Sequence, residues 1–223
     1  MKKLLLISSA FIFSFGINNA NAQSTNPPFY NDIQNFKKQD SINPPPQHAV
    51  LFVGSSSFTK WTDVQNYFPN VKIINRGFGG SILPDVIRYA NDIIIPYHPK
   101  QVVIYCGDND LAASDTVTAE MVVARAKQLF QMVRNKLPDA NIAYVSIKPS
   151  PSRARLLAKD EAANNAIKSY LATQKNTAFI DVYHAMLTGS GQPISEIFLS
   201  DSLHMNAKGY QIWQKIINPV LLK

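Results

Sequence analysis

Four short segments of the chain combine small polar side chains with glycine, and they hold the residue types that acyl transfer needs. They are Gly54-Ser55-Ser56-Ser57, Asn75-Arg76-Gly77-Phe78-Gly79-Gly80-Ser81, Gly107-Asp108-Asn109-Asp110 and Asp201-Ser202-Leu203-His204. A serine hydroxyl is a poor nucleophile at its own pKa and needs a neighbouring base. His204 could be that base through one ring nitrogen, and Asp201 could accept a hydrogen bond from the other.

Attack on an ester also needs hydrogen-bond donors for the negative oxygen that develops in the transition state. The backbone N–H of Ser56, the backbone N–H of Gly80 and the side-chain amide of Asn109 would form such an oxyanion hole. Because Gly80 carries no Cβ, the backbone there can approach a substrate closely. The four segments therefore predict a serine-dependent acyl-transfer site, provided that the fold brings them together.

Short apolar runs alternate with helical patterns between these segments. The expected strands are Ala49–Val53, Val71–Ile74, Gln101–Tyr105, Ile142–Ser146 and Ala178–Asp181, and the expected helices are Asp85–Ile95, Thr118–Leu137, Arg153–Thr173 and Ala207–Ile217. This alternation predicts one α/β domain with a five-stranded parallel sheet covered on both faces. Ligands of such sheets bind at the carboxyl ends of the strands. Three of the polar segments follow strands and the fourth precedes the last helix, and all four are expected to meet at this edge.

The order of the four segments resembles that of the SGNH hydrolases, also called the GDSL esterase/lipase family. The resemblance covers the chain from Val50 to about Tyr210 and implies a flavodoxin-like three-layer α/β/α sandwich. It also implies roles for five residues: Ser56 as the nucleophile, Gly80 and Asn109 as oxyanion donors, His204 as the base and Asp201 as its orienting acid. The stretch 75–81 is similar to the platelet-activating-factor-acetylhydrolase-like branch of the family.

The first segment departs from the family pattern. It commonly reads Gly-Asp-Ser, whereas this chain has Gly54-Ser55-Ser56. The missing aspartate is not the catalytic acid, so the change does not indicate inactivation. It leaves three consecutive serines, and the choice of Ser56 depends on the Gly-x-Ser register. Ser55 and Ser57 remain alternative nucleophiles.

Several other residues allow two interpretations. Cys106 ends an apolar run and is expected to be a small buried core residue, with a reactive thiol as the alternative. Lys148, Arg153 and Arg155 follow the fourth expected strand, either as charges of a solvated loop or as contacts to a polar or negatively charged substrate. His184 could line the rim of the site.

The N-terminus has the three parts of a secretory signal. Lys2 and Lys3 precede the apolar run Leu4–Ile17, which is shorter than the about 20 residues of a membrane-spanning helix. Ala20-Asn21-Ala22 follows as a cleavage pattern. We therefore expect a signal peptide at 1–22 cleaved after Ala22, a Pro/Asn-rich linker at 23–46 with about one helical turn, and the hydrolase domain at 47–223. The cleaved product would be a secreted or periplasmic bacterial protein without a membrane anchor.

Composition excludes several function classes. The chain has 223 residues and a formal charge of +7, from 22 basic and 15 acidic residues. The basic residues form no block, so we expect no nucleic-acid partner. One cysteine allows no intramolecular disulfide, and the four histidines lack metal-ligand spacing. We expect neither a metal nor a cofactor, and the oligomeric state stays open.

These observations lead to one preferred hypothesis and three alternatives. The preferred one is an exported serine esterase that removes short acyl groups, acetyl in particular, from a small ester or an acetylated glycan. A lysophospholipase or thioesterase would use the same residues. A non-catalytic binding module would keep only the fold, and a flavodoxin-like cofactor binder is the last alternative.

Overall fold

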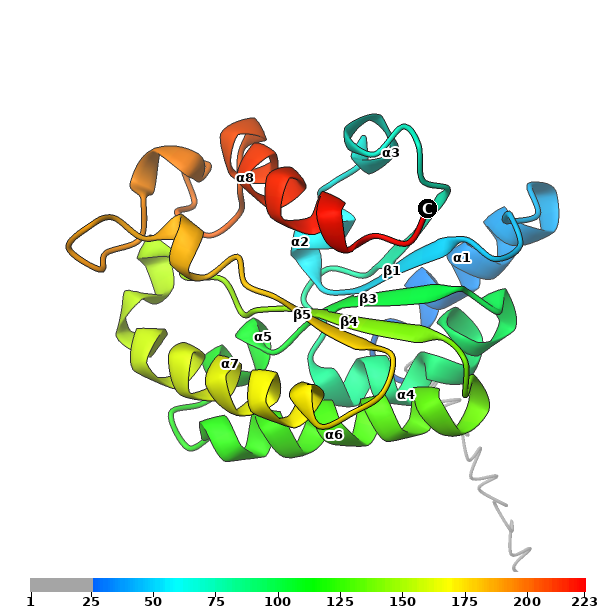
Figure 1. The fold of residues 1–223 in the computed structure, drawn as a ribbon, viewed down its shortest axis with the longest axis horizontal. Helices are drawn as coiled ribbons and strands as arrows, with labels where there is room; N and C mark the ends of the chain where they lie inside the picture. The colour runs from blue at the N-terminus through cyan, green and yellow to red at the C-terminus, as the bar shows by residue number, and fades with distance from the viewer. Residues whose placement is uncertain (1–25) are drawn as a thin grey trace, which may run out of the picture.

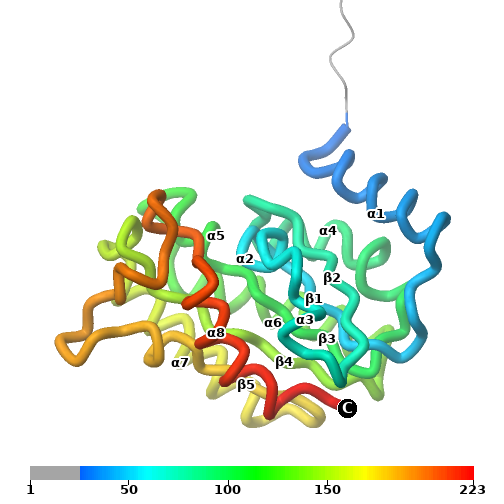
Figure 2. Tube along the Cα trace, turned by 90° about the horizontal axis from the view of Figure 1, so that it is seen from above, coloured from blue at the N-terminus to red at the C-terminus, as the bar shows by residue number. Residues whose placement is uncertain are grey.

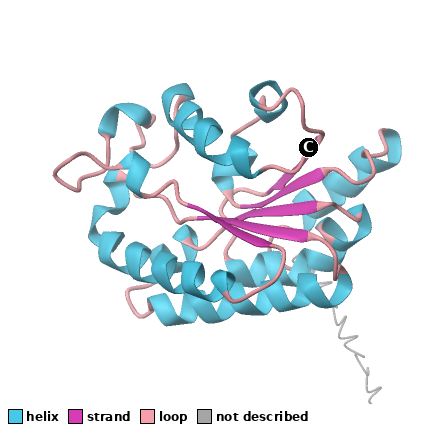
Figure 3. Ribbon diagram, viewed as in Figure 1, coloured by secondary structure: helices cyan, strands magenta, loops and turns pink. Residues whose placement is uncertain are grey.

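The computed structural model describes residues 26–223, so the expected signal peptide at 1–22 lies outside the described residues. These residues form a three-layer α/β/α sandwich around a five-stranded, all-parallel sheet (Figures 1 and 3). The strand order is β2-β1-β3-β4-β5, which is the flavodoxin-like order. The strands are β1 (Val50–Gly54), β2 (Ile73–Gly77), β3 (Gln101–Tyr105), β4 (Asn141–Val145) and β5 (Thr177–Ile180). The predicted fold class is confirmed.

Strand β1 lies between β2 and β3 and pairs in parallel with both. Its burial explains why its sequence is a continuous apolar run. Val50 pairs with Ile73 on one side and with Gln101 on the other. All five residues of β1 and all five of β3 are buried. A strand covered on both faces needs a continuous apolar run instead of an alternating one, and these two runs have that pattern.

Helices cover both faces of the sheet (Figures 1 and 2). The face with the longest helices carries α4 (Leu83–Ile93), α6 (Ala119–Lys136) and α7 (Leu157–Ala172), and the opposite face carries α2 (Ser56–Thr59), α3 (Val64–Tyr67) and α8 (Ala207–Ile217). Helix α5 (Asp108–Ala113) follows β3. The short 3-10 helices are η1 (Ile95–Tyr97), η2 (Pro151–Leu156), η3 (His184–Met186), η4 (Ser195–Ile197) and η5 (Asn218–Val220). No helix within residues 26–223 is both long and apolar enough to cross a membrane.

The sheet separates two hydrophobic clusters. Alternate residues of β1 point to opposite faces, so Leu51 belongs to the cluster under α4, α6 and α7, and Phe52 to the cluster under α8. The second cluster is rich in aromatic rings, and Trp61 stacks on Tyr210 of α8 with 4.7 Å between ring centroids. Cys106 is fully buried in the first cluster, as expected.

The segment expected to be a linker differs from the prediction. Tyr30–Ile42 forms the 13-residue helix α1 in place of about one helical turn. The helix is attached to the domain: Ile33 is 1% exposed, the Tyr89 hydroxyl donates to the carbonyl of Pro28 at 2.7 Å, and Asp40 pairs with Arg76. These partners are distant in the sequence, so the segment itself carries no sign of them. Its polar composition alone therefore predicted a linker.

Candidate active site

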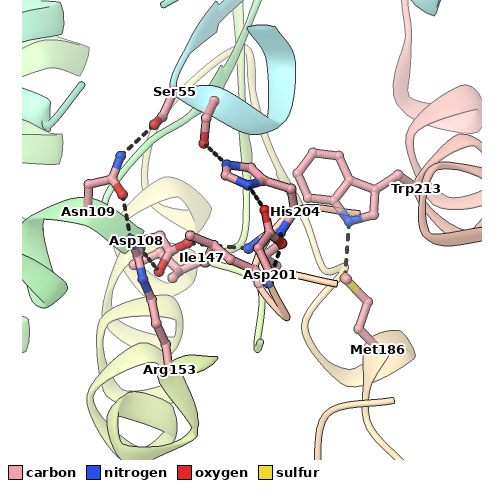
Figure 4. Close-up of polar contacts among 12 residues, drawn as sticks. Ser55, Asp108, Asn109, Ile147, Arg153, Met186, Asp201, His204 and Trp213 are labelled. Carbon is pink, nitrogen blue, oxygen red and sulfur yellow. Dashed lines mark hydrogen bonds and ion pairs between the residues drawn. The ribbon is translucent and has the colours of Figure 1, made fainter. Parts of the chain in front are cut away.

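The carboxyl ends of β1 and β3 and the turn before α8 bring the candidate residues together (Figure 4). His204 Nε2 lies 3.0 Å from Ser56 Oγ, and His204 Nδ1 lies 2.7 Å from Asp201 Oδ2. Ser56 and His204 are 148 residues apart in the chain. The three side chains thus form a continuous chain of hydrogen-bonding contacts, the geometry in which a histidine can take a proton from a serine hydroxyl.

The end of β1 determines which serine faces the histidine. Gly54 has φ 137°, and a Cβ at this position would lie 1.9 Å from the carbonyl oxygen of Tyr105. Only glycine can therefore make this sharp transition from β1 into α2. Ser55 and Ser57 are buried, at 3% and 2% exposed, whereas Ser56 is partly exposed. Of the three serines, Ser56 is the one in contact with His204.

The turn that carries Asp201 holds this carboxylate in place. Asp201 Oδ1 accepts hydrogen bonds from the backbone N–H groups of Leu203, at 3.0 Å, and His204, at 2.9 Å. The hydrogen bond with the His204 ring, followed by these backbone bonds, holds the pKa of Asp201 well below its usual range. Asp201 is therefore ionised and can orient the ring and stabilise an imidazolium.

The candidate oxyanion donors come from three places: the start of α2, the loop after β2 and the start of α5. Asn109 Nδ2 donates to Ser55 Oγ at 2.7 Å and to the Ser81 carbonyl at 3.1 Å. Gly80 has φ 88°, a backbone conformation that favours glycine. Within residues 26–223, the N–H groups of Gly80 and Ser56 have no hydrogen-bond acceptor. They are available to a substrate oxygen, and the Asn109 amide reaches the same region from α5.

The structure also explains the departure from Gly-Asp-Ser. Ser55 is buried directly beside the nucleophile candidate, and its hydroxyl accepts the Asn109 amide. Ser55 therefore holds the amide close to Ser56 without a charge. The sequence contained no signal for this contact, because 54 residues separate the two side chains.

A buried ionic cluster lies behind Asn109, and the sequence analysis did not find it. Asp108 contacts Lys148 Nζ at 3.3 Å and Arg153 NH1 at 2.6 Å. The side chain of Lys148 is only 1% exposed, so the solvated-loop interpretation is wrong for this residue. Arg155, in contrast, is 60% exposed and pairs with Asp115. A charged residue after a strand does not itself indicate whether it points into or away from the domain.

His184 does not join the Ser56 site. Its Nδ1 lies 2.8 Å from Asp181 Oδ2, and its side chain is 63% exposed. Among the described residues, its side-chain hydrogen bonding is with Asp181 alone. No group of three or more His, Cys, Asp or Glu side chains within residues 26–223 could hold a metal ion.

The fold and the site together are those of an acylhydrolase: a flavodoxin-like sandwich with a Ser-His-Asp arrangement at the carboxyl edge of its sheet. The model of the GDSL-like Lipase/Acylhydrolase family matches residues 46–212. The chain belongs to this family and is a carboxylic ester hydrolase.

Curated relatives cover most of the domain. The human platelet-activating factor acetylhydrolase IB subunit alpha1 is 25% identical over 179 residues, which are 78% of this chain and 75% of the relative. The rat alpha2 subunit is 27% identical over 183 residues, which are 77% of this chain and 73% of the relative.

Solved structures share the fold at lower identity. A GDSL-like lipase from Bacteroides thetaiotaomicron superposes with a TM-score of 0.69 at 18% identity, covering 84% of this chain and 96% of that one. A catalytic mutant of an acetylxylan esterase from Geobacillus stearothermophilus superposes with a TM-score of 0.63 at 14% identity. The superposition covers 80% of this chain and 96% of the esterase.

Proposed function

We propose that the protein is an exported esterase that removes short acyl groups, acetyl in particular, from a polar substrate such as an acetylated glycan. Ser56 is the nucleophile, His204 the general base and acid, and Asp201 the group that orients the histidine. The backbone N–H groups of Ser56 and Gly80 and the amide of Asn109 stabilise the oxyanion. The contacts from Ser56 through His204 to Asp201 carry this proposal.

The reaction follows from the contacts. Ser56 Oγ attacks the ester carbonyl while His204 Nε2 takes its proton, and the carbonyl oxygen becomes an oxyanion. Collapse of this tetrahedral intermediate releases the alcohol, which receives the proton from His204. Water activated by His204 then attacks the acyl-serine, and a second collapse frees the carboxylic acid and Ser56. Asp201 stays ionised throughout and stabilises the imidazolium.

Exposure of the site supports a small acyl group on a polar substrate. The side chain of Asp201 is 46% exposed and that of His204 is 18% exposed. The catalytic turn therefore lies at the surface, where a glycan can reach it without entering a deep apolar tunnel. The names of several relatives, an acetylhydrolase and an acetylxylan esterase among them, specify acetyl groups and agree with this choice.

Hydrolysis of p-nitrophenyl esters from acetate to palmitate tests the proposal. We expect cleavage of the acetate ester, a decline with chain length, and loss of turnover in Ser56→Ala with an unchanged circular dichroism spectrum. Ser57→Ala is the matched control, because Ser57 is buried beside Ser56 and should leave turnover within about threefold. A preference for long chains would instead favour a lysophospholipase or thioesterase, and turnover by Ser56→Ala would refute the nucleophile.

Export is proposed from the N-terminal pattern alone. Lys2 and Lys3, the apolar run and Ala20-Asn21-Ala22 support cleavage after Ala22. Intact mass measurement of the protein from a bacterial host should give a chain that begins at Gln23 in the periplasmic or extracellular fraction. A chain that retains its N-terminus in the cytoplasm would refute export while leaving the esterase proposal intact.

A further inference from the structure

The guanidinium of Arg153 bridges Asp108 and the oxyanion donor Asn109 (Figure 4). Its NH1 lies 2.6 Å from Asp108 Oδ1, and its NH2 donates to Asn109 Oδ1 at 2.9 Å. We propose that Arg153 is a positioning residue for the hydrolysis, one that holds the Asn109 amide with its N–H groups toward Ser55 and Ser81, beside the nucleophile Ser56. The proposal rests on the roles of Ser56 and Asn109 given above.

The first argument concerns the orientation of the amide. The oxygen and nitrogen of an asparagine side chain exchange places when the amide rotates by half a turn. Arg153 can only donate, and the Ser81 carbonyl, 3.1 Å from Asn109 Nδ2, can only accept. A rotated amide would place N–H groups against the guanidinium and its oxygen against a carbonyl. Arg153 and Ser81 therefore select one of the two orientations.

The second argument concerns charge. A hydrogen bond from a cation to the amide oxygen draws electron density from the nitrogen, which makes its N–H groups better donors to an oxyanion. The side chain of Arg153 is 18% exposed, so water screens this effect only in part. Oxyanion stabilisation depends on such preorganised dipoles in a site from which water is largely excluded.

The third argument concerns what holds Arg153. Burial opposes the charged form of Asp108, but Lys148 and Arg153 outweigh it, and the pKa of Asp108 lies below its usual value. The ionised carboxylate fixes the guanidinium, and Lys148 supports the carboxylate from its other oxygen. In addition, the Ser152 N–H donates to the Ser202 carbonyl at 3.0 Å. Helix η2, which carries Arg153, is therefore hydrogen-bonded both to Asn109 and to the turn that carries Asp201 and His204.

Steady-state kinetics on the best p-nitrophenyl ester test the proposal. In Arg153→Met, we expect kcat to fall about 10- to 100-fold while KM changes less than about threefold, because the donor is misplaced in the transition state. In an Asn109→Ala background, the same substitution should change kcat less than about threefold, because the amide that it positions is absent. Arg155→Met is the matched control: Arg155 lies on the same short helix, pairs with the exposed Asp115 and should leave kcat unchanged.

A second measurement keeps the proposal testable apart from turnover. The side-chain amide of Asn109 can be assigned by nuclear magnetic resonance from its loss in Asn109→Ala. We expect its order parameter to fall in Arg153→Met and to stay unchanged in Arg155→Met. If the wild-type protein hydrolysed no ester, this comparison would still test the positioning role.

Two results would overturn the proposal. One is an equal loss of kcat from Arg153→Met with and without Asn109, since that would indicate general damage to the site. The other is wild-type kcat together with an unchanged Asn109 order parameter. Should Arg153→Met fail to fold, Arg153→Lys replaces it: one ammonium cannot bridge Asp108 and Asn109 as the guanidinium does, so an intermediate kcat is expected and wild-type kcat would contradict the proposal.

Discussion

Asp201 contacts one nitrogen of the His204 ring, Nδ1, and substitution of Asp201 measures how much this contact contributes to kcat. In Asp201→Asn, the side-chain amide would donate toward Nδ1 and favour the tautomer that cannot accept a proton from Ser56. We expect kcat on the acetate ester to fall about 100-fold or more, with measurable residual turnover. His204→Ala should be more severe, because it removes the base itself.

The chain supplies a matched control for this prediction. Asp181 and His184 form a second Asp-x-x-His turn in which Nδ1 lies 2.8 Å from the carboxylate, and this turn has no contact with Ser56 among the described residues. Asp181→Asn should leave kcat unchanged. Wild-type kcat in Asp201→Asn would show that Ser56 and His204 act as a dyad.

Asp160 is a second carboxylate whose environment has a measurable consequence. It is 1% exposed, and burial, followed by the nearby Asp108, raises its pKa to about 8. The folded state therefore keeps this proton up to about pH 8, whereas the unfolded chain loses it near pH 4. Between these values the folded state binds more protons, so this group lowers the stability of the fold as the pH rises.

Replacement of Asp160 by asparagine should remove the loss of stability that this carboxyl group causes as the pH rises. We expect Asp160→Asn to increase the free energy of unfolding by more at pH 8 than at pH 5, with a difference of at least about 1 kcal/mol. Urea denaturation at both pH values measures it. Glu161→Gln is the control, because Glu161 is the exposed neighbour on the same helix and should give the same small change at both. An equal effect of Asp160→Asn at both pH values would contradict the raised pKa.

The sequence predicted that Ser56, His204 and Asp201 would meet, but it did not predict the charged residues packed behind Asn109. Ser56, His204 and Asp201 each lie in a short segment whose composition indicates a loop beside a strand or helix, and the order of segments identified the family. Lys148 and Asp108 have no such pattern, because they are 40 residues apart and only the packing of β3 beside β4 brings them together. Long-range charge pairs of this kind need the three-dimensional structure.

At the scale of elements, helix α1 depends on contacts that lie outside it. Asp40 pairs with Arg76, which is 11% exposed on its side chain, and accepts the Tyr97 hydroxyl at 2.5 Å. In Asp40→Asn, the mostly buried guanidinium loses its charged partner, so we expect the free energy of unfolding to fall by about 2–3 kcal/mol. Urea denaturation followed by tryptophan fluorescence measures this.

Another residue of α1 serves as the control. Lys37 forms an ion pair with Asp92, but its side chain is 49% exposed. Exposed pairs contribute little, so Lys37→Ala should change the free energy of unfolding by less than about 1 kcal/mol. Equal effects of the two substitutions would indicate that α1 is held by apolar contacts, such as those of Ile33, and not by the Asp40–Arg76 pair.

The sequence predicted the bounds of a helix well where local periodicity sets them, and poorly where contacts with distant residues do. Helix α8 has the predicted bounds, Ala207–Ile217, because its apolar residues recur with helical spacing and Asn206 caps its first turn. The expected helix 153–173 instead divides into η2 and α7, and Arg153 has φ −119°, which is not helical. Arg153 forms an ion pair with Asp108 and donates a hydrogen bond to Asn109, and both partners lie outside the local sequence, so periodicity could not predict this break.

At the scale of the whole molecule, the sheet lies between two hydrophobic clusters and contributes side chains to both. Every residue of β1 and β3 is buried, and alternate side chains enter opposite clusters. The site is attached to both sides: Ser56 begins α2 on one face, while Asn109 belongs to α5, which packs against α6 and α7. Loss of either core should therefore disturb the same active site.

Two neighbouring residues of β1 test this coupling. Leu51 and Phe52 are both fully buried, but they belong to opposite clusters. We expect Leu51→Ala to lower the free energy of unfolding by about 2–5 kcal/mol and Phe52→Ala by about 3–5 kcal/mol. In both variants, helical circular dichroism, tryptophan fluorescence and ester hydrolysis should be lost in one coincident thermal transition. Fluorescence reports chiefly on the face that holds Trp61 and Trp213. If Leu51→Ala lost helical signal at a lower temperature than fluorescence, the two layers would unfold independently, and the central strands would not transmit stability between the cores.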